Sequence, residues 1–111
     1  MSLAIFPSVV TGITANTGST QATGETLKAR VSVISTCANA GDAVTLPTGC
    51  GIGAEFFVRN NGAASADVFP PSGGAFNGGS TDAAFAVTNA KSGWFVCVSS
   101  NGLTWVATLS A

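Results

Sequence analysis

The sequence contains no histidine and no tyrosine. Histidine is the commonest general base and metal ligand near neutral pH, and tyrosine is a frequent proton donor, so their absence leaves few groups for acid–base catalysis. The five carboxylates are scattered, and nothing in their spacing indicates the facing pair that glycoside hydrolysis needs; they are Glu25, Asp42, Glu55, Asp67 and Asp82. We therefore predict that the protein is not an enzyme and binds no metal or other cofactor.

Charged residues are also scarce. Four Lys and Arg and five Asp and Glu make up 8% of the 111 residues and give a net charge of −1. Four cations are too few to neutralise a row of phosphates, so we expect no nucleic-acid partner. The hydrophobic share of 46% predicts that the chain folds, and its length fits one domain. So weakly charged a surface indicates a protein that meets a partner.

No segment is typical of a transmembrane helix or of a secretory signal. The longest uncharged stretch, residues 2–24, is interrupted by Pro7, Gly12, Asn16 and Gly18. The first seven residues lack the positive charge with which a secretory signal begins. We expect no membrane contact and a protein made in the cytoplasm.

The three cysteines, Cys37, Cys50 and Cys97, are an odd number and include no Cys-x-x-Cys pair. A zinc site normally needs four ligands, and no histidine is available as the fourth. We interpret the cysteines as buried free thiols, and Cys97 fits this because it lies in an apolar run. A bridge between Cys37 and Cys50 is the alternative in an oxidising setting.

The chain divides into two parts of different composition. Residues 1–24 begin with an apolar stretch and continue almost entirely in Thr, Gly, Ala, Asn and Ser, which indicates an extended N-terminal arm and a loop. Residues 25–111 are predicted to form the folded domain. At its start, apolar and polar residues alternate as in a half-buried strand, with Leu27, Ala29, Val31 and Val33 on one face and Lys28, Arg30 and Ser32 on the other.

Short apolar runs then recur about every ten residues, each bounded by turn formers. They lie at residues 43–46, 54–60, 66–69, 83–88, 93–99 and 103–109, with a brief extended piece around residues 75–76. Asn-Gly pairs at residues 61–62 and 101–102 predict hairpins with type I′ turns. Pro70 and Pro71 must turn a corner or follow an edge, since neither can donate to a sheet. Helical signals are nearly absent, so we predict an all-β fold.

The predicted core contains most of the aromatic residues and several valines: Trp94, Trp105, Phe56, Phe57, Phe69, Phe85, Phe95, Val58, Val68, Val87, Val96 and Val106. Consecutive aromatics at 56–57 and 94–95 must point to opposite faces of their strands. A two-layer sandwich buries only one face of each sheet, so the other aromatic either contacts a second subunit or larger surface, or is simply exposed.

Four segments in a fixed order resemble a known group of proteins. They are DAVTLP at residues 42–47, FVRNNG at 57–62, VFPPSGGAFNG at 68–78 and the hairpin from Trp94 to Trp105. The order and spacing, over about residues 26–108, resemble small β-sandwich domains of tailed-phage structural proteins, especially capsid decoration or cement proteins. The resemblance implies a jelly-roll-like antiparallel β-sandwich on the outer surface of an icosahedral capsid, as a homodimer or homotrimer that clamps neighbouring major capsid protein subunits. It transfers no catalytic residue.

In this picture the apolar residues of the arm lie along the capsid or a sister subunit; they are Leu3, Ile5, Phe6, Val9 and Val10. The alternatives are a disordered N-terminus or a strand of the chain's own sandwich. Two other functions compete with the virion structural role. The first is a carbohydrate- or receptor-binding module of a phage tail or head fibre, which exposed aromatics in a shallow groove would favour. The second is a small hydrolase, which only the scattered acids favour.

Overall fold

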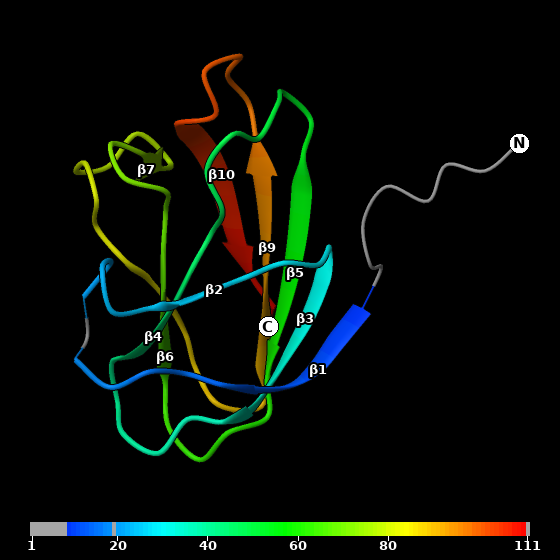
Figure 1. Ribbon diagram of the computed structural model, residues 1–111, viewed down its shortest axis with the longest axis vertical. Coiled ribbons are helices and arrows are strands. Elements are labelled where there is room, and N and C mark those ends of the chain that lie inside the picture. Colours follow the sequence, from blue (N-terminus) through cyan, green and yellow to red (C-terminus); the bar gives the residue numbers. More distant parts are fainter. Residues whose placement is uncertain (1–8, 19, 111) are drawn as a thin grey trace, which may run out of the picture.

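The computed structural model describes residues 9–18 and 20–110, and these form two β-sheets packed face to face (Figure 1). The six-stranded sheet has the order β1 (Val9–Thr14), β3 (Val31–Thr36), β5 (Glu55–Asn60), β9 (Lys91–Cys97), β10 (Thr104–Leu109) and β7 (Ala75–Phe76). The four-stranded sheet has the order β2 (Glu25–Thr26), β4 (Asp42–Thr45), β6 (Ala66–Phe69) and β8 (Phe85–Val87). The all-β, two-sheet prediction is confirmed. Within the described residues, no helix is long and apolar enough to cross a membrane.

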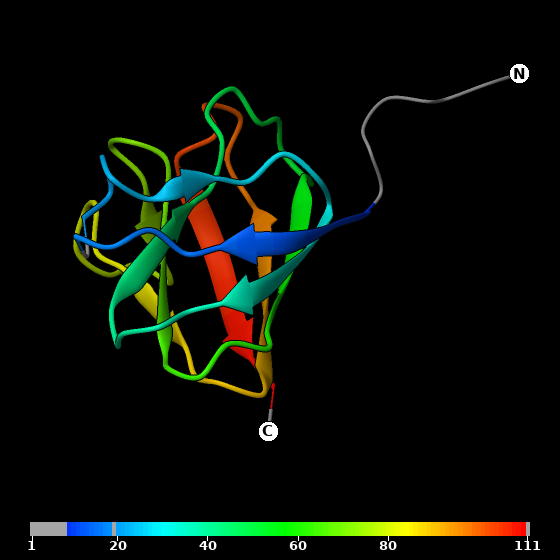
Figure 2. The ribbon, with the colours of Figure 1, turned by 60° about the horizontal axis from the view of Figure 1, so that its bottom comes forward.

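The chain passes to the other sheet after every strand from β1 to β8, and only β9 and β10 follow each other in one sheet. From β1 to β6, each strand runs in the same direction as the strand two steps earlier in the chain. Strands β1, β3 and β5 are therefore parallel neighbours, as are β2, β4 and β6 (Figure 2). The antiparallel pairing we expected is wrong for these four pairs and for β7–β10, which is also parallel, although it holds for β5–β9, β9–β10 and β6–β8. This order does not confirm a jelly-roll topology.

The alternating segment that starts at residue 26 is not one strand. Leu27 and Ala29 are buried as predicted, but the buried residues of β3 are Ser32 and Ile34. Val31 and Val33, which we expected on the same face as Leu27 and Ala29, lie on the opposite side of β3. The phase changes because residues 27–30 carry the chain from the four-stranded sheet to the six-stranded sheet, and the core lies between them.

The two Asn-Gly sites also differ from each other. The site at residues 101–102 lies in the β9–β10 hairpin as predicted, with positive φ at Gly102 but not at Asn101, so the turn is not type I′. The hairpin predicted at residues 60–62 is wrong, because β5 and β6 belong to different sheets. Gly62 is needed for space, since a Cβ there would lie 2.5 Å from the Cys37 nitrogen.

Residues 70–71 follow the end of β6 and turn the corner toward β7, as predicted. Both prolines are fully buried.

The core between the sheets is built around aromatic rings. Phe76, Phe85 and Phe95 pack together with ring centroids 5.4 to 6.1 Å apart. Trp105 is fully buried beside Phe56, at a centroid distance of 5.9 Å. Three residues that we predicted in the core are exposed instead; they are Trp94, Phe57 and Val106.

Candidate interaction surface

Exposed apolar side chains gather on the outer face of the six-stranded sheet. Pairing in register places one residue from each of five adjacent strands in a row: Val9, Val31, Phe57, Trp94 and Thr108. Beside this row, Val96 of β9 pairs with Val106 of β10. We call the set Val9, Val31, Phe57, Trp94, Val96 and Val106 the outer apolar face. The exposed fraction is 42% for Phe57, 47% for Trp94, 45% for Val106 and 51% for Val9.

The period of two in each strand produces this face. In β9, Phe95 points into the core and is fully buried, so its neighbour Trp94 must point outward. In β10, Trp105 points inward and Val106 points outward by the same rule. The sequence therefore places large apolar side chains on both faces of these strands. The four-stranded sheet covers only one of these faces.

Polar groups lie on both sides of the aromatic centre of the face, which consists of Phe57 and Trp94. Glu55 and Arg59 lie on β5, two residues before and two residues after Phe57. Trp94 Nε1 donates a hydrogen bond to Glu55 Oε1 at 3.2 Å, which orients the indole ring. Arg59 Nε donates to Asn61 Oδ1 at 2.7 Å and Nη1 donates to the Ala90 carbonyl at 2.9 Å. One acid and one base are thus held at opposite ends of the aromatic centre.

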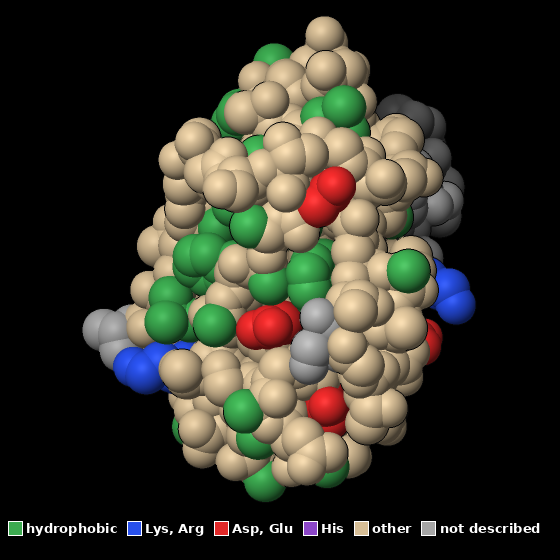
Figure 3. All heavy atoms as spheres, turned by 90° about the vertical axis from the view of Figure 1, so that its left-hand side faces the viewer, with side chains coloured by type: hydrophobic (Ala, Val, Ile, Leu, Met, Phe, Trp, Pro, Cys, Tyr) green, Lys and Arg blue, Asp and Glu red, His purple; other side chains and the backbone are tan. Residues whose placement is uncertain are grey.

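The opposite side of the molecule is different. Figure 3 shows the side that carries β4 and β6, where polar side chains and backbone predominate and Lys and Arg appear only at the margins. Hydrophobic side chains on that side form small groups separated by polar atoms (Figure 3). The in-register row is therefore a feature of the six-stranded sheet.

The residues predicted as capsid or subunit contacts fall into two groups. Leu3, Ile5 and Phe6 lie outside the described residues. Val9 and Val10 belong to β1, the edge strand that pairs with β3 of the same sandwich. Val9 points outward in the row, whereas Val10 pairs with the buried Ser32 and points to the inner side. The predicted division at residues 24–25 stays a prediction, although β1 is hydrogen-bonded into the six-stranded sheet.

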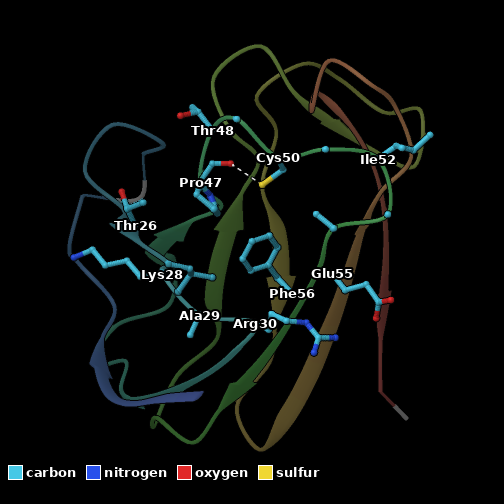
Figure 4. A pocket seen from close by; sticks show the side chains of 15 residues that line it. Thr26, Lys28, Ala29, Arg30, Pro47, Thr48, Cys50, Ile52, Glu55 and Phe56 are labelled. Carbon is cyan, nitrogen blue, oxygen red and sulfur yellow. Dashed lines mark hydrogen bonds between the residues drawn. The ribbon is translucent and has the colours of Figure 1, made fainter. Parts of the chain in front are cut away.

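A cavity of about 640 Å³ opens between residues 26–30 and residues 47–56. Its lining includes the buried Leu27, the ring of Phe56 and the thiol of Cys50. Figure 4 shows Lys28 pointing away from Phe56. Cys50 Sγ donates to the Pro47 carbonyl at 3.5 Å, and burial, with a smaller effect of nearby Cys97, raises the pKa of the Cys50 thiol. A raised pKa disfavours the reactive thiolate, so this thiol is poorly suited to nucleophilic catalysis.

All three cysteines are free thiols. Cys37 and Cys97 are buried, as predicted, while Cys50 is half-buried. Cys37 Sγ donates to the carbonyls of Asn39 and Ser65, and no bridge joins Cys37 to Cys50. Burial raises the pKa of the Cys37 thiol as well, and Asp42 and Asp67 add to the shift.

Asp42 and Asp82 accept hydrogen bonds from backbone and side-chain groups of the chain. Asp42 Oδ2 accepts from the Asn39 amide at 3.2 Å, and Asp82 Oδ1 accepts from the Gly73 amide at 2.7 Å and from Gln21 Nε2 at 3.0 Å. Among residues 9–18 and 20–110, no group of three His, Cys, Asp or Glu side chains is placed to hold a metal ion. The prediction of a non-enzymatic protein stays a prediction.

No family model and no curated protein matches the sequence. Among solved structures, one similar chain is described as "Structure of a chaperone-substrate complex". It is 18% identical with a TM-score of 0.48, and the match covers 78% of this chain and 15% of that chain.

Proposed function

We propose that this chain is a non-enzymatic virion structural protein that decorates an icosahedral phage capsid and stabilises it by clamping neighbouring major capsid protein subunits. The outer apolar face is the observation that carries the proposal. It joins five strands of one sheet, and its aromatic centre is about half exposed. Apolar area of this kind gains roughly 25 cal/mol per Å² when a partner removes it from water.

The composition of the chain supports a permanent contact. Nine charged residues in 111 give a surface with few groups that would oppose burial against a partner. The protein then acts on the outer surface of the capsid after synthesis in the host cytoplasm, as a homodimer or homotrimer. Neither a membrane nor a nucleic acid takes part.

The N-terminal arm extends this contact in the proposal. β1 begins at Val9, which stands at one end of the outward-facing row. Leu3, Ile5 and Phe6, which precede β1 in the sequence, are proposed to bind the capsid or a sister subunit. The proposal rests on the two-layer sandwich and not on a jelly-roll connection, because parallel pairs run through both sheets.

Reconstitution on capsids tests this function. Capsids assembled from tailed-phage major capsid proteins are mixed with purified chain and examined by cryo-electron microscopy. We expect density at regular lattice positions and a higher melting temperature of the shell. Deleting residues 1–8 should weaken the binding, and this deletion leaves all ten strands intact. Absence of lattice density for the full chain would contradict the proposal.

A carbohydrate- or receptor-binding module is the second candidate, and the exposure of Trp94 favours it. Sugar rings stack on flat aromatic faces, and Trp94 lies beside the exposed Phe57 with the Glu55 carboxylate as a polar neighbour. A glycan array with the Trp94→Ala variant tests this function. Ile52→Ala is the matched control, because Ile52 is exposed in the loop before β5. Binding that is lost only in Trp94→Ala would support the module.

A further inference from the structure

We infer that the outer apolar face is the contact between two copies of this chain, related by a twofold axis that runs in the face along the row from Val9 to Thr108. This inference specifies the homo-oligomer of the proposed function and therefore rests on it; the dimer uses the outer apolar face, and residues outside this face then make the capsid contact. A homodimer normally uses the same patch on both copies, so the patch must complement itself after a half-turn. The charged residues on either side of Phe57 determine which half-turn makes the outer apolar face complementary to itself.

The charge pattern lies along β5. Its outward side chains are Glu55, Phe57 and Arg59, which form the order acid, aromatic, base. The in-plane axis crosses β5 at Phe57 and is perpendicular to the strand. A half-turn about it therefore exchanges the two ends of the strand. Each Glu55 then faces Arg59 of the second copy, while each Phe57 faces its own equivalent.

The charges also disfavour a twofold axis that runs along β5. If the axis ran along β5, Glu55 would face Glu55 and Arg59 would face Arg59. Like charges placed opposite each other disfavour an interface. The perpendicular axis turns the same four side chains into two ion pairs, so the sequence of β5 favours an antiparallel stacking of the two β5 strands.

Glu55 and Arg59 each have one polar atom without a hydrogen-bond partner among the described residues. Among the described residues, Arg59 uses Nε and Nη1 for hydrogen bonds within the chain, and its Nη2 has no partner. Glu55 uses Oε1 for the indole of Trp94, and the described residues give Oε2 no donor. The free nitrogen and the free oxygen are the two groups that an intermolecular pair would join.

Sheet twist concentrates the contact at the centre of the row. Twisted sheets stack closely over a limited area and diverge toward their corners. The crossing region contains Phe57 and Trp94, the two largest exposed side chains of the face. Aromatic residues at the centre of an interface with a polar rim are typical of protein–protein contacts.

Sedimentation equilibrium of the full chain and of charge variants tests the inference. We expect the wild type to form a dimer whose dissociation constant rises about tenfold or more in Glu55→Arg and in Arg59→Glu, because each variant places like charges opposite each other. The double variant Glu55→Arg/Arg59→Glu restores the opposite pairs and should dimerise like the wild type. Rescue by the double variant is an effect that loss of a merely structural residue would not produce.

An apolar substitution gives a second, independent readout. Phe57→Ser should abolish the dimer, and Ile52→Ser, at an exposed site outside the face, should leave it unchanged. Circular dichroism of every variant checks that the fold is retained. A wild-type chain that stays monomeric or forms a trimer would overturn the inference, and so would single charge variants that dimerise normally.

The tests separate this inference from the proposed function. A chain that is monomeric in solution and binds capsids through the same face refutes the dimer and leaves the decoration role standing. A chain that dimerises with charge rescue and binds no capsid refutes the decoration role and leaves the dimer standing. Binding of a glycan to Trp94 in the monomer would assign the face to a sugar and refute both.

Discussion

Replacing the two tryptophans in turn measures whether the outer apolar face is a free surface of the folded monomer. Trp105 is fully buried, packs against Phe56 and donates from Nε1 to the Gly102 carbonyl at 3.0 Å. Trp105→Ala removes this packing and leaves that carbonyl without its partner, so it should cost about 4 kcal/mol of unfolding free energy. Trp94 is 47% exposed, and Trp94→Ala should cost less than about 1 kcal/mol in the monomer.

Urea unfolding at a dilution that favours the monomer gives both values, and quenching of tryptophan fluorescence by acrylamide gives a second measure. In the wild type, one tryptophan should be quenched and one protected, and Trp94→Ala should leave only the protected emission. Raising the protein concentration should protect Trp94 as well, because the dimer covers it. Equal stability losses in the two variants, or a protected Trp94 in the monomer, would refute the outward placement of β9 side chains at the face.

Three further predictions concern single polar side chains. Asn60 is fully buried, and its side chain bonds Ala64, Val87 and the Gly62 amide, so Asn60→Ala should lower the unfolding free energy by about 3 kcal/mol; urea unfolding checks this, with the exposed Asn61→Ala as a control. Burial raises the pKa of Asp67, so its stabilising effect is full below its unfolded pKa of about 3.9 and is lost as the pH rises through the folded value. Asp67→Asn should therefore be at least as stable as the wild type at neutral pH, which thermal melts across the acidic range would test. Cys50 should react slowly with iodoacetamide at neutral pH and faster as the pH rises, since its pKa is raised, whereas the buried Cys97 should react only on unfolding; mass spectrometry of the alkylated chain distinguishes the two.

Local patterns in the sequence identified most of the strands. Turn formers bound short apolar runs, and the period of two indicates where each strand runs; the strands β4, β5, β6, β9 and β10 lie within two residues of the predicted positions. The corner at residues 70–71 follows from the missing amide donors of two prolines. The odd number of cysteines and the lack of histidine led to free thiols, as observed. Each of these inferences depends only on composition or on neighbours along the chain.

The sequence also indicated that the candidate site exists, but not where it lies. Consecutive aromatics at residues 56–57 and 94–95 predicted that some would point outward. The pattern alone did not tell which member of each pair faces the core, because both are equally apolar. Phe57 and Trp94 face outward because β5 and β9 pair in the six-stranded sheet, whose other face is covered by the second sheet.

Contacts between residues far apart in the sequence decided the remaining features of the fold. The chain crosses between sheets at residues 27–30, so the buried face changes from Leu27 and Ala29 to Ser32 and Ile34, which no local period could reveal. Asn60 resembles a hairpin residue, yet it ties β5 to the Val87 carbonyl of β8 in the other sheet. The sequence by itself determined most of the strands, the corner at residues 70–71 and the low charge of the surface, because these depend on short-range geometry and composition. Only the tertiary structure decided the parallel pairing and the row of exposed side chains, because both depend on which strands become neighbours in space.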